Sequence, residues 1–283
     1  MSQNLQSLKK RIKTAQNISQ IARAMEMIAA SKIKKAQAAA QNNKPYSDKI
    51  TEVLDRMLSS SRAEDIEHPY MAKNVNTQNR LLIAFSPDRG LAGSIVTNLC
   101  RKLLEFGSGN LTVVTVGNKI ERFASRMGYE IPASFPFGGK FPHYTSVYPL
   151  MNIIQRSYLG KQVSEVHLLY TEFRSFFSQS PVAVKVLPIE PPKQAAENQV
   201  LPYKFEPGLQ YILNELIPYY LEIKLFNALI QAYTSEQAAR MIAMGNAKEN
   251  ALDIGESLTL TYNKTRQERI TNEILDLANA KIS

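Results

Sequence analysis

The chain has 283 residues, of which 44% are hydrophobic and 21% charged, and it carries an excess of nine positive charges. This length allows about two domains, and the composition excludes collagen-like, prion-like and wholly disordered chains. The charge favours an acidic partner, whether nucleic acid, an anionic membrane or an acidic protein surface. One cysteine and three scattered histidines argue against an internal disulfide and a zinc site.

We expect neither a membrane span nor a secretion signal. No apolar run reaches the roughly 18 residues that a span needs, and the N-terminus lacks the apolar segment of a signal peptide. The first residues are basic and amphipathic, as in an organelle transit peptide, but they continue into a longer helical pattern. We therefore expect a soluble, intracellular chain whose N-terminus belongs to the mature fold.

Residues 1–60 predict one long helix. They contain one proline and no glycine, and their apolar residues recur at helical spacing. The expected buried stripe consists of Leu5, Leu8, Ile12, Ala15, Ile18, Ile21, Met25, Ile28 and Ile33. Up to residue 41 the stretch holds eight basic residues and one acidic residue, so most of the excess charge lies here. Residues 61–79 form a polar linker.

Residues 80–203 alternate short apolar runs with helical patterns. Strands are predicted at 81–85, 111–116, 166–170 and 182–187, and helices at 94–106, 118–127 and 146–158. Such alternation indicates a small α/β domain with a largely parallel sheet.

Residues 208–283 form a second long helical pattern. The last 65 of them contain no proline and as one helix would measure roughly 97 Å, which no compact domain can surround. We expect this helix to pair with the N-terminal one. The predicted fold class is therefore α/β, a long antiparallel coiled coil of the terminal helices with an inserted α/β domain. Gly245 and Gly255 lower the helix propensity, so the rod should not be uniformly stiff.

Motifs for catalysis or nucleotide binding are missing from the sequence. No Walker loop, dinucleotide fingerprint, nucleophile elbow or HExxH zinc motif occurs, and the glycines of residues 138–140 lack the spacing of a phosphate loop. Residues 86–93 do lie between a strand and a helix, where anions bind in doubly wound folds. We favour a simpler interpretation, in which Asp88 and Gly90 make the turn and Gly93 lets the helix pack.

Three motifs in order along nearly the whole chain resemble those of the gamma subunit of F-type ATP synthase. They are residues 11–32, residues 88–93, and residues 235–244 with 258–267. The resemblance implies a rotor shaft whose terminal helices enter a ring of three alpha and three beta subunits. The inserted domain, Rossmann-like in the family, would lie below that ring and dock with epsilon on the membrane ring of c subunits. The shaft would bind no cofactor, because alpha and beta hold the Mg-ATP or Mg-ADP.

The resemblance also implies residues that couple the shaft to beta. Met25 matches a methionine that faces an acidic segment of beta, and Arg23 and Lys32 are basic neighbours suited to that segment. Lys34 and Lys35 add to the same charge.

Further implied coupling residues lie in the C-terminal helix. Arg266 and Gln267 match a pair that hydrogen-bonds a beta loop, and Arg240 and Asp276 match positions linked to coupling. Residues 277–283 would sit in an apolar sleeve at the top of the ring.

The sequence departs from the family pattern at a few positions. Pro87 stands where serine is common, Ala92 where cysteine is frequent, and Gly245 where a longer polar residue is usual. The regulatory dithiol insert of the chloroplast type is absent, because Cys100 is alone. We therefore expect a bacterial subunit, peripheral at the cytoplasmic face of the plasma membrane.

Two alternatives stay open from the residues alone. A basic coiled-coil protein could bind nucleic acid through its N-terminal arm, and its binding would then weaken steeply with salt. An α/β nucleotide-binding enzyme with helical arms would bind nucleotide in its middle domain.

Overall fold

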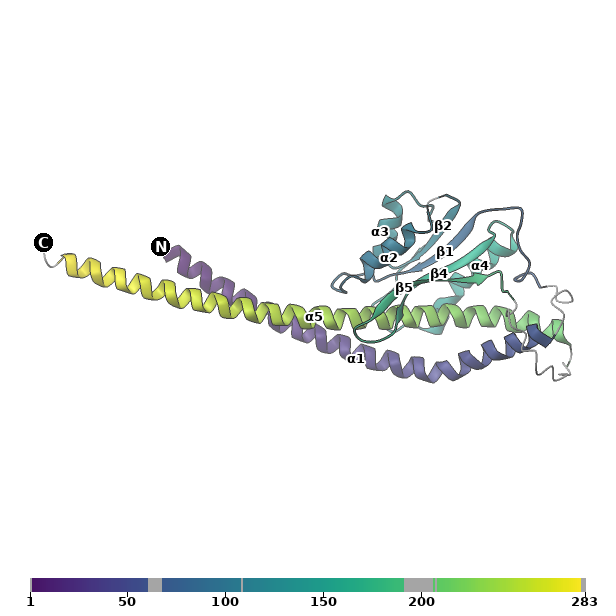
Figure 1. Ribbon diagram of the computed structural model, residues 1–283, viewed down its shortest axis with the longest axis horizontal. Helices are drawn as coiled ribbons and strands as arrows, with labels where there is room; N and C mark the ends of the chain where they lie inside the picture. Colours follow the sequence, from purple (N-terminus) through teal and green to yellow (C-terminus); the bar gives the residue numbers. More distant parts are fainter. Residues whose placement is uncertain (1, 61–67, 108, 191–205, 207, 281–283) are drawn as a thin grey trace. The chain divides into compact units, whose positions relative to one another are not determined.

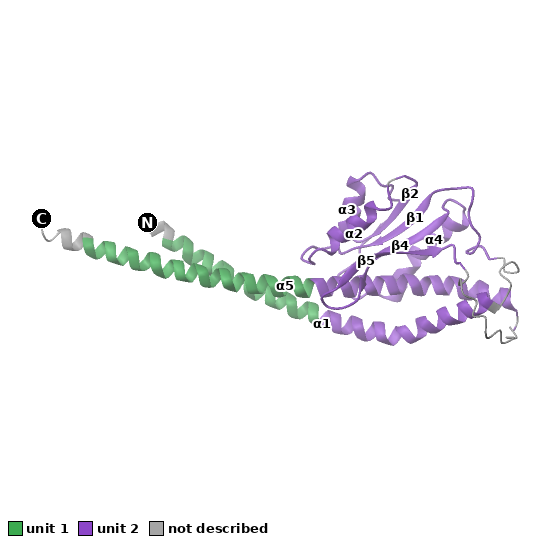
Figure 2. Cartoon of the chain, viewed as in Figure 1, with its two compact units in different colours: residues 1–30, 240–283 green, residues 31–239 purple. Residues whose placement is uncertain are grey.

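Two long helices, α1 (Ser2–Ser60) and α5 (Leu209–Ala280), make up nearly half of the chain (Figure 1). The computed structural model describes residues 2–60, 68–107, 109–190, 206 and 208–280. The chain divides into two units: residues 1–30 with 240–283, called the coil unit here, and residues 31–239, called the sheet unit (Figure 2).

In the coil unit α1 and α5 form an antiparallel pair. The Lys248 ammonium lies 3.0 Å from a carboxylate oxygen of Glu26, and a Cβ added at Gly245 would lie 3.4 Å from the other carboxylate oxygen. Farther along, a Cβ added at Gly255 would lie 3.8 Å from the Cβ of Ala15. Residue numbers thus fall on one helix as they rise on the other, which is the predicted coiled-coil pairing.

The contact between the two helices repeats every seven residues. On α1 the buried positions Leu8, Ala15, Ala22 and Ala29 follow this period. On α5 Met244 and Ala251 are buried and Leu258 is half-buried, again seven residues apart. A seven-residue seam is typical of a left-handed coiled coil, and alanine or glycine in it lets the helices approach closely.

The expected buried stripe of α1 is wrong at three positions. Ile18, Ile21 and Ile28 are 49%, 61% and 57% exposed, whereas Ser19 is buried. The prediction chose the largest apolar side chains at helical spacing. The helices instead meet along a narrow seam rich in alanine, which leaves these three isoleucines outside it.

The sheet unit contains a five-stranded sheet in the order β3-β2-β1-β4-β5. Among the strands that the structure describes, only β4 and β5 pair antiparallel, so the predicted, largely parallel sheet is confirmed. The strands are β1 (Arg80–Phe85), β2 (Leu111–Val116), β3 (Ser134–Phe135), β4 (Glu165–Phe173) and β5 (Gln179–Leu187). The short helices are α2 (Ile95–Leu104), α3 (Asn118–Arg126), η2 (Tyr144–Val147) and α4 (Tyr148–Leu159).

The sheet is covered on both faces, as a mostly parallel sheet requires. Helices α2 and α3 pack on one face through a core that includes Leu82, Leu99 and Ile120. On the other face α4 joins residues 54–58 of α1 and 213–232 of α5 in a second core. The long helices are therefore part of the inserted domain's own core, and the α/β fold class is confirmed.

Candidate functional site

The carboxyl ends of β1 and β4 are where a doubly wound sheet of this strand order would bind a ligand. Here α5 occupies the end of β4. The Ser235 hydroxyl donates to the Thr171 carbonyl oxygen at 2.9 Å, and the Phe173 amide donates to Gln231 Oε1 at 3.0 Å. Because the chain's own helix fills this place, the geometry gives no support to a nucleotide-binding enzyme.

The loop after β1 has a structural role, as the sequence predicted. Asp88 does not only make a local turn, however, because it binds residues 30 to 50 positions farther along the chain. The Asp88 carboxylate accepts hydrogen bonds from the backbone amides of Asn118, Phe137 and Gly138, at 3.0, 3.2 and 2.7 Å. Gly93 has a positive φ of 59°, a conformation that glycine adopts without strain. The carboxylate is thus already used by protein donors.

The described residues offer neither a metal site nor a membrane span. No three of their histidine, cysteine, aspartate and glutamate side chains gather closely enough to hold a metal ion. None of the described helices is both long and apolar enough to cross a membrane.

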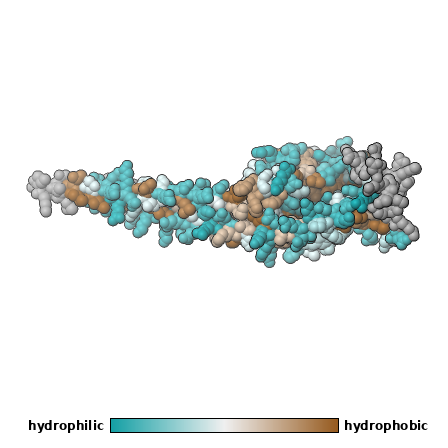
Figure 3. All heavy atoms as spheres, turned by 60° about the horizontal axis from the view of Figure 1, so that its bottom comes forward, coloured by the Kyte–Doolittle hydropathy of each residue, from teal (hydrophilic) through white to brown (hydrophobic). Residues whose placement is uncertain are grey.

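The coil unit carries much apolar surface. Hydrophobic residues interrupt its hydrophilic surface along its length (Figure 3). The exposed large apolar side chains of this unit are Ile18, Ile21, Met27, Ile28, Leu252, Ile254, Leu260, Ile270, Ile274 and Leu275. Because so many large apolar side chains of two paired helices are exposed, the coil unit is a candidate interaction surface.

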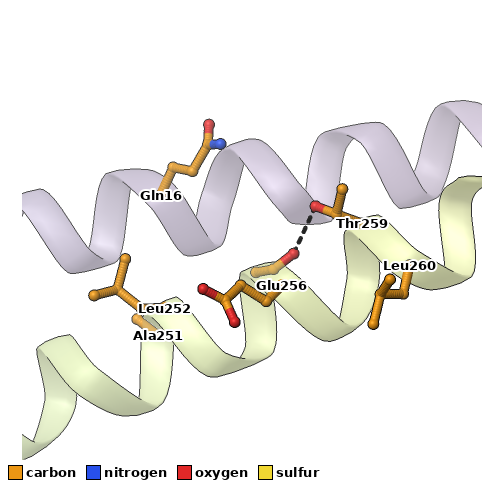
Figure 4. Close-up of a pocket in the computed structure, with 7 residues that line it drawn as sticks. Gln16, Ala251, Leu252, Glu256, Thr259 and Leu260 are labelled. Carbon is orange, nitrogen blue, oxygen red and sulfur yellow. Dashed lines mark hydrogen bonds between the residues drawn. The ribbon is translucent and has the colours of Figure 1, made fainter.

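An open groove of about 400 Å³ lies between α1 and α5 in the coil unit (Figure 4). Gln16 lines it from α1, and Leu252, Glu256 and Leu260 line it from α5. On its wall the Thr259 hydroxyl donates to the Gly255 carbonyl oxygen at 2.8 Å. The lining is largely apolar, so the groove suits an apolar side chain of a partner.

A second groove, of about 430 Å³, lies nearer the N-terminus of α1 and is cationic. Lys9 from α1 and Arg266 and Arg269 from α5 line it, and Glu273 pairs with Arg269 at 2.7 Å. The groove therefore keeps a net positive charge that suits an acidic partner segment. The sequence prediction named Arg266 but missed Lys9 and Arg269, although residues 266, 269 and 273 share one helical face.

Four other predicted coupling residues, Arg23, Met25, Arg240 and Gln267, do not line that groove. In the coil unit Met25 and Arg240 are half-buried, whereas Arg23 and Gln267 are exposed. The side chains of residues 276–280, and residues 281–283 altogether, lie outside the described part of the chain, so the expected sleeve contact of residues 277–283 is untested. These positions therefore stay predictions.

Lys32 belongs to the sheet unit and has a partner within the chain. Its ammonium group donates to the Gly139 carbonyl oxygen at 2.8 Å. A contact with an acidic partner segment, as the sequence predicted, would have to share or replace this hydrogen bond.

Comparison with known proteins finds matches that extend over nearly the whole chain. The family model described as ATP synthase matches residues 4–281. The ATP synthase gamma chain of Dehalococcoides mccartyi is 38% identical over 277 residues, which cover 97% of this chain and 96% of that protein. The chain belongs to the ATP synthase gamma chain family. A second member, from a Roseiflexus species, is 35% identical and covers 96% of this chain and 95% of its own length.

Solved structures share the fold of this gamma chain family member. The rotor of Euglena gracilis mitochondrial ATP synthase superposes with a TM-score of 0.71 at 16% identity, covering 95% of this chain and 100% of that chain. The central stalk of the Tetrahymena thermophila mitochondrial enzyme gives 0.60 at 22% identity, covering 80% and 99%. The comparisons give no support to a nucleic-acid-binding protein.

Proposed function

We propose that this chain is the central rotor shaft of a bacterial F-type ATP synthase, driven by translocation of protons or sodium ions. Its coil unit turns inside a ring of three alpha and three beta subunits. The sheet unit joins epsilon and the c-subunit ring. The chain is thus peripheral to the plasma membrane, at its cytoplasmic face.

The outward-facing apolar side chains of the coil unit carry this proposal. A coiled coil that stands alone in water buries its large apolar residues in the seam, but here alanine and glycine take many of the seam positions, beside Leu8 and Met244. Ile18, Ile21 and Leu260 are instead at least 49% exposed. Such a pair of helices gains stability when a surrounding partner covers its outer face.

The shaft would act by making different contacts with each of the three identical beta subunits. Its two helices differ in sequence, so each beta subunit meets a different set of side chains. A contact that is stronger with one conformation of beta shifts that subunit toward the favoured nucleotide state. Rotation then passes each state to the next beta subunit. The chain itself catalyses no step and binds no cofactor, because Mg-ATP and Mg-ADP are held by alpha and beta.

The charged side chains would set where beta binds. Arg266, Gln267 and the cationic groove beside them suit an acidic beta loop, and Met25 with Arg23 suits an acidic segment of beta. Arg240 and Asp276 are the further positions that we assign to coupling.

The test is copurification of the tagged chain from its native membranes, followed by partner identification and an ATPase assay. We expect alpha, beta, epsilon and c subunits, with Mg-dependent ATP hydrolysis. Arg266→Ala or Gln267→Ala should lower turnover of the assembled complex by about tenfold, as expected for loss of one charged or polar contact. The matched control, Arg122→Ala, changes an exposed arginine of α3 in the sheet unit. Recovery of the chain alone, or equal effects of Arg266→Ala and Arg122→Ala, would contradict the proposal.

A further inference from the structure

Two stretches of the sequence are not explained by a role as a shaft: the loop 86–93 and the glycine-rich passage around residues 138–140. In the sheet unit they meet. Asp88 Oδ1 accepts the amide hydrogens of Asn118 and Phe137, and Oδ2 accepts that of Gly138. Gly138 has φ of 81°, a left-handed conformation, which helps to turn its amide and that of Phe137 toward one carboxylate.

The same passage also reaches both long helices. One residue after Gly138, the Gly139 carbonyl oxygen accepts a hydrogen bond from the Lys32 ammonium of α1 at 2.8 Å. Two residues later, the Phe141 ring meets the buried Tyr233 ring of α5 edge-on, with centroids 5.7 Å apart. Within five residues the chain is therefore attached to the end of the sheet, to α1 and to α5.

We propose that residues 136–143 form a strap that fastens the sheet to the two long helices and carries load between them, with Asp88 and Lys32 as its positioning residues. The proposal rests on the rotor function. The strap would transmit torque between the sheet and the helices when the rotor turns against a load.

The chemistry of the contacts supports a load-bearing role. The core between the sheet and the long helices is apolar, and apolar contact has no preferred direction, so it resists separation better than sliding. Hydrogen bonds are directional, and those with a charged partner are the stronger ones. The Asp88 and Lys32 bonds thus add resistance to sliding at this passage, beside the bonds of Ser235 and Gln231 of α5 to the end of β4.

Each positioning residue has a variant that removes its hydrogen bonds with little change of shape. Asp88→Asn leaves one oxygen for three amide donors, and its own NH2 group would face one of them. Lys32→Gln shortens the side chain and removes the charge, whereas Lys32→Arg keeps a charged donor. Lys44→Gln is the matched control, because Lys44 is an exposed lysine of α1 in the same unit.

The first measurement is hydrogen exchange of residues 136–143 in the full-length chain. We expect Asp88→Asn and Lys32→Gln each to speed amide exchange there by about fivefold, the effect of one lost hydrogen bond. Lys32→Arg and Lys44→Gln should leave it unchanged. Unchanged exchange in Lys32→Gln would overturn the strap, because Asp88 would then merely support the fold of the sheet.

The second measurement compares ATP hydrolysis with ATP-driven ion pumping in vesicles holding the assembled complex. We expect the ratio of pumping to hydrolysis to fall about fivefold in either variant, as one weakened attachment allows the rotor to yield. The double variant should be no worse than the more damaging single one, because both residues act on one strap. Additive effects would overturn the proposal and show that Lys32 acts through a partner subunit. Failure of the rotor function would appear differently, as a chain without ATPase partners whose hydrogen exchange still responds to Lys32→Gln.

Discussion

In the sheet unit large apolar side chains such as Ile83, Phe85 and Tyr158 are at most 1% exposed, whereas in the coil unit Ile18, Ile21 and several others face outward. The sheet unit thus has the core of a domain that folds by burying its own side chains. The coil unit is held by a narrow seam in which small residues are frequent. The difference teaches that one chain can combine a self-sufficient domain with an arm whose stability depends on what surrounds it.

The largest loss of unfolding free energy is expected at Gly117 of the sheet unit, which has no room for a side chain. A Cβ at Gly117 would lie 1.9 Å from the Ser86 carbonyl oxygen, and Gly117 has a φ of 111°. Gly117→Ala should therefore cost about 3 kcal/mol or more of unfolding free energy, from both the clash and the backbone strain. Urea unfolding measures it, with Gly128→Ala as a control that has a positive φ but open space around its Cα. Equal losses in the two variants would show that strain alone matters.

The same substitution, isoleucine to alanine, can be made at a buried position of the sheet unit and at an exposed position of the coil unit. The two variants compare directly how much each unit depends on its apolar side chains for stability. Ile83→Ala should lower the unfolding free energy by about 2 to 5 kcal/mol, since Ile83 is fully buried. Ile21→Ala should change it by less than about 0.5 kcal/mol, because Ile21 is exposed. The second variant should instead weaken association with alpha and beta, measured by the salt at which the subunits dissociate. A large loss of stability in isolated Ile21→Ala would break the comparison.

Acid sensitivity should come partly from the sheet unit. Burial lowers the pKa of His68 below its usual 6.5, and its Nδ1 accepts the Tyr70 amide at 3.2 Å. Because the folded pKa is depressed, the stabilisation is fully present above pH 6.5 and is lost as the pH falls through the folded pKa. Thermal unfolding between pH 7 and pH 5 should show a smaller decrease for His68→Asn than for the parent chain. The exposed His143 supplies the control His143→Asn, which should retain the parent's decrease.

The smallest change in stability is expected at Gly245 in the coil unit, where a substitution should stabilise the chain and not destabilise it. A Cβ at Gly245 would lie in ordinary contact with Glu26, at 3.4 Å, so Gly245→Ala should fit. It should stabilise the coil unit by up to about 1 kcal/mol through higher helix propensity. Hydrogen exchange of the amides of residues 240–255 measures the change. Faster exchange in the variant would mean that Glu26 cannot give way, and that the glycine is needed for the helices to approach.

The sequence predicted the elements whose period is regular. Both long helices, the strands at 81–85 and 111–116 and the α/β fold class follow from helical or continuous apolar patterns, and the resemblance agreed with that fold class. The two residues of β3 were missed, because the proline- and glycine-rich passage around them shows no period. The seam was misplaced because spacing alone cannot tell whether isoleucine or the neighbouring alanine lies between two helices that approach closely.

The candidate site was less accessible to sequence reasoning. Arg266 and Gln267 came from the resemblance, and no pattern of spacing joins them to Lys9 at the other end of the chain. The hydrogen bond between Lys32 and Gly139 spans 107 residues, so it depends on how a loop folds back onto α1. Charge and composition indicated an acidic partner but could not separate a lysine that serves the chain from one that is free to bind.

The seven-residue seam also gives the pair of helices a handedness. An undistorted α-helix has about 3.6 residues per turn, so keeping a seven-residue repeat in contact winds the two helices around each other to the left. A torque about the axis of this supercoil tightens the winding when it acts in one direction and loosens it when it acts in the other. The torsional stiffness of the coil unit should therefore differ between the two directions of rotation.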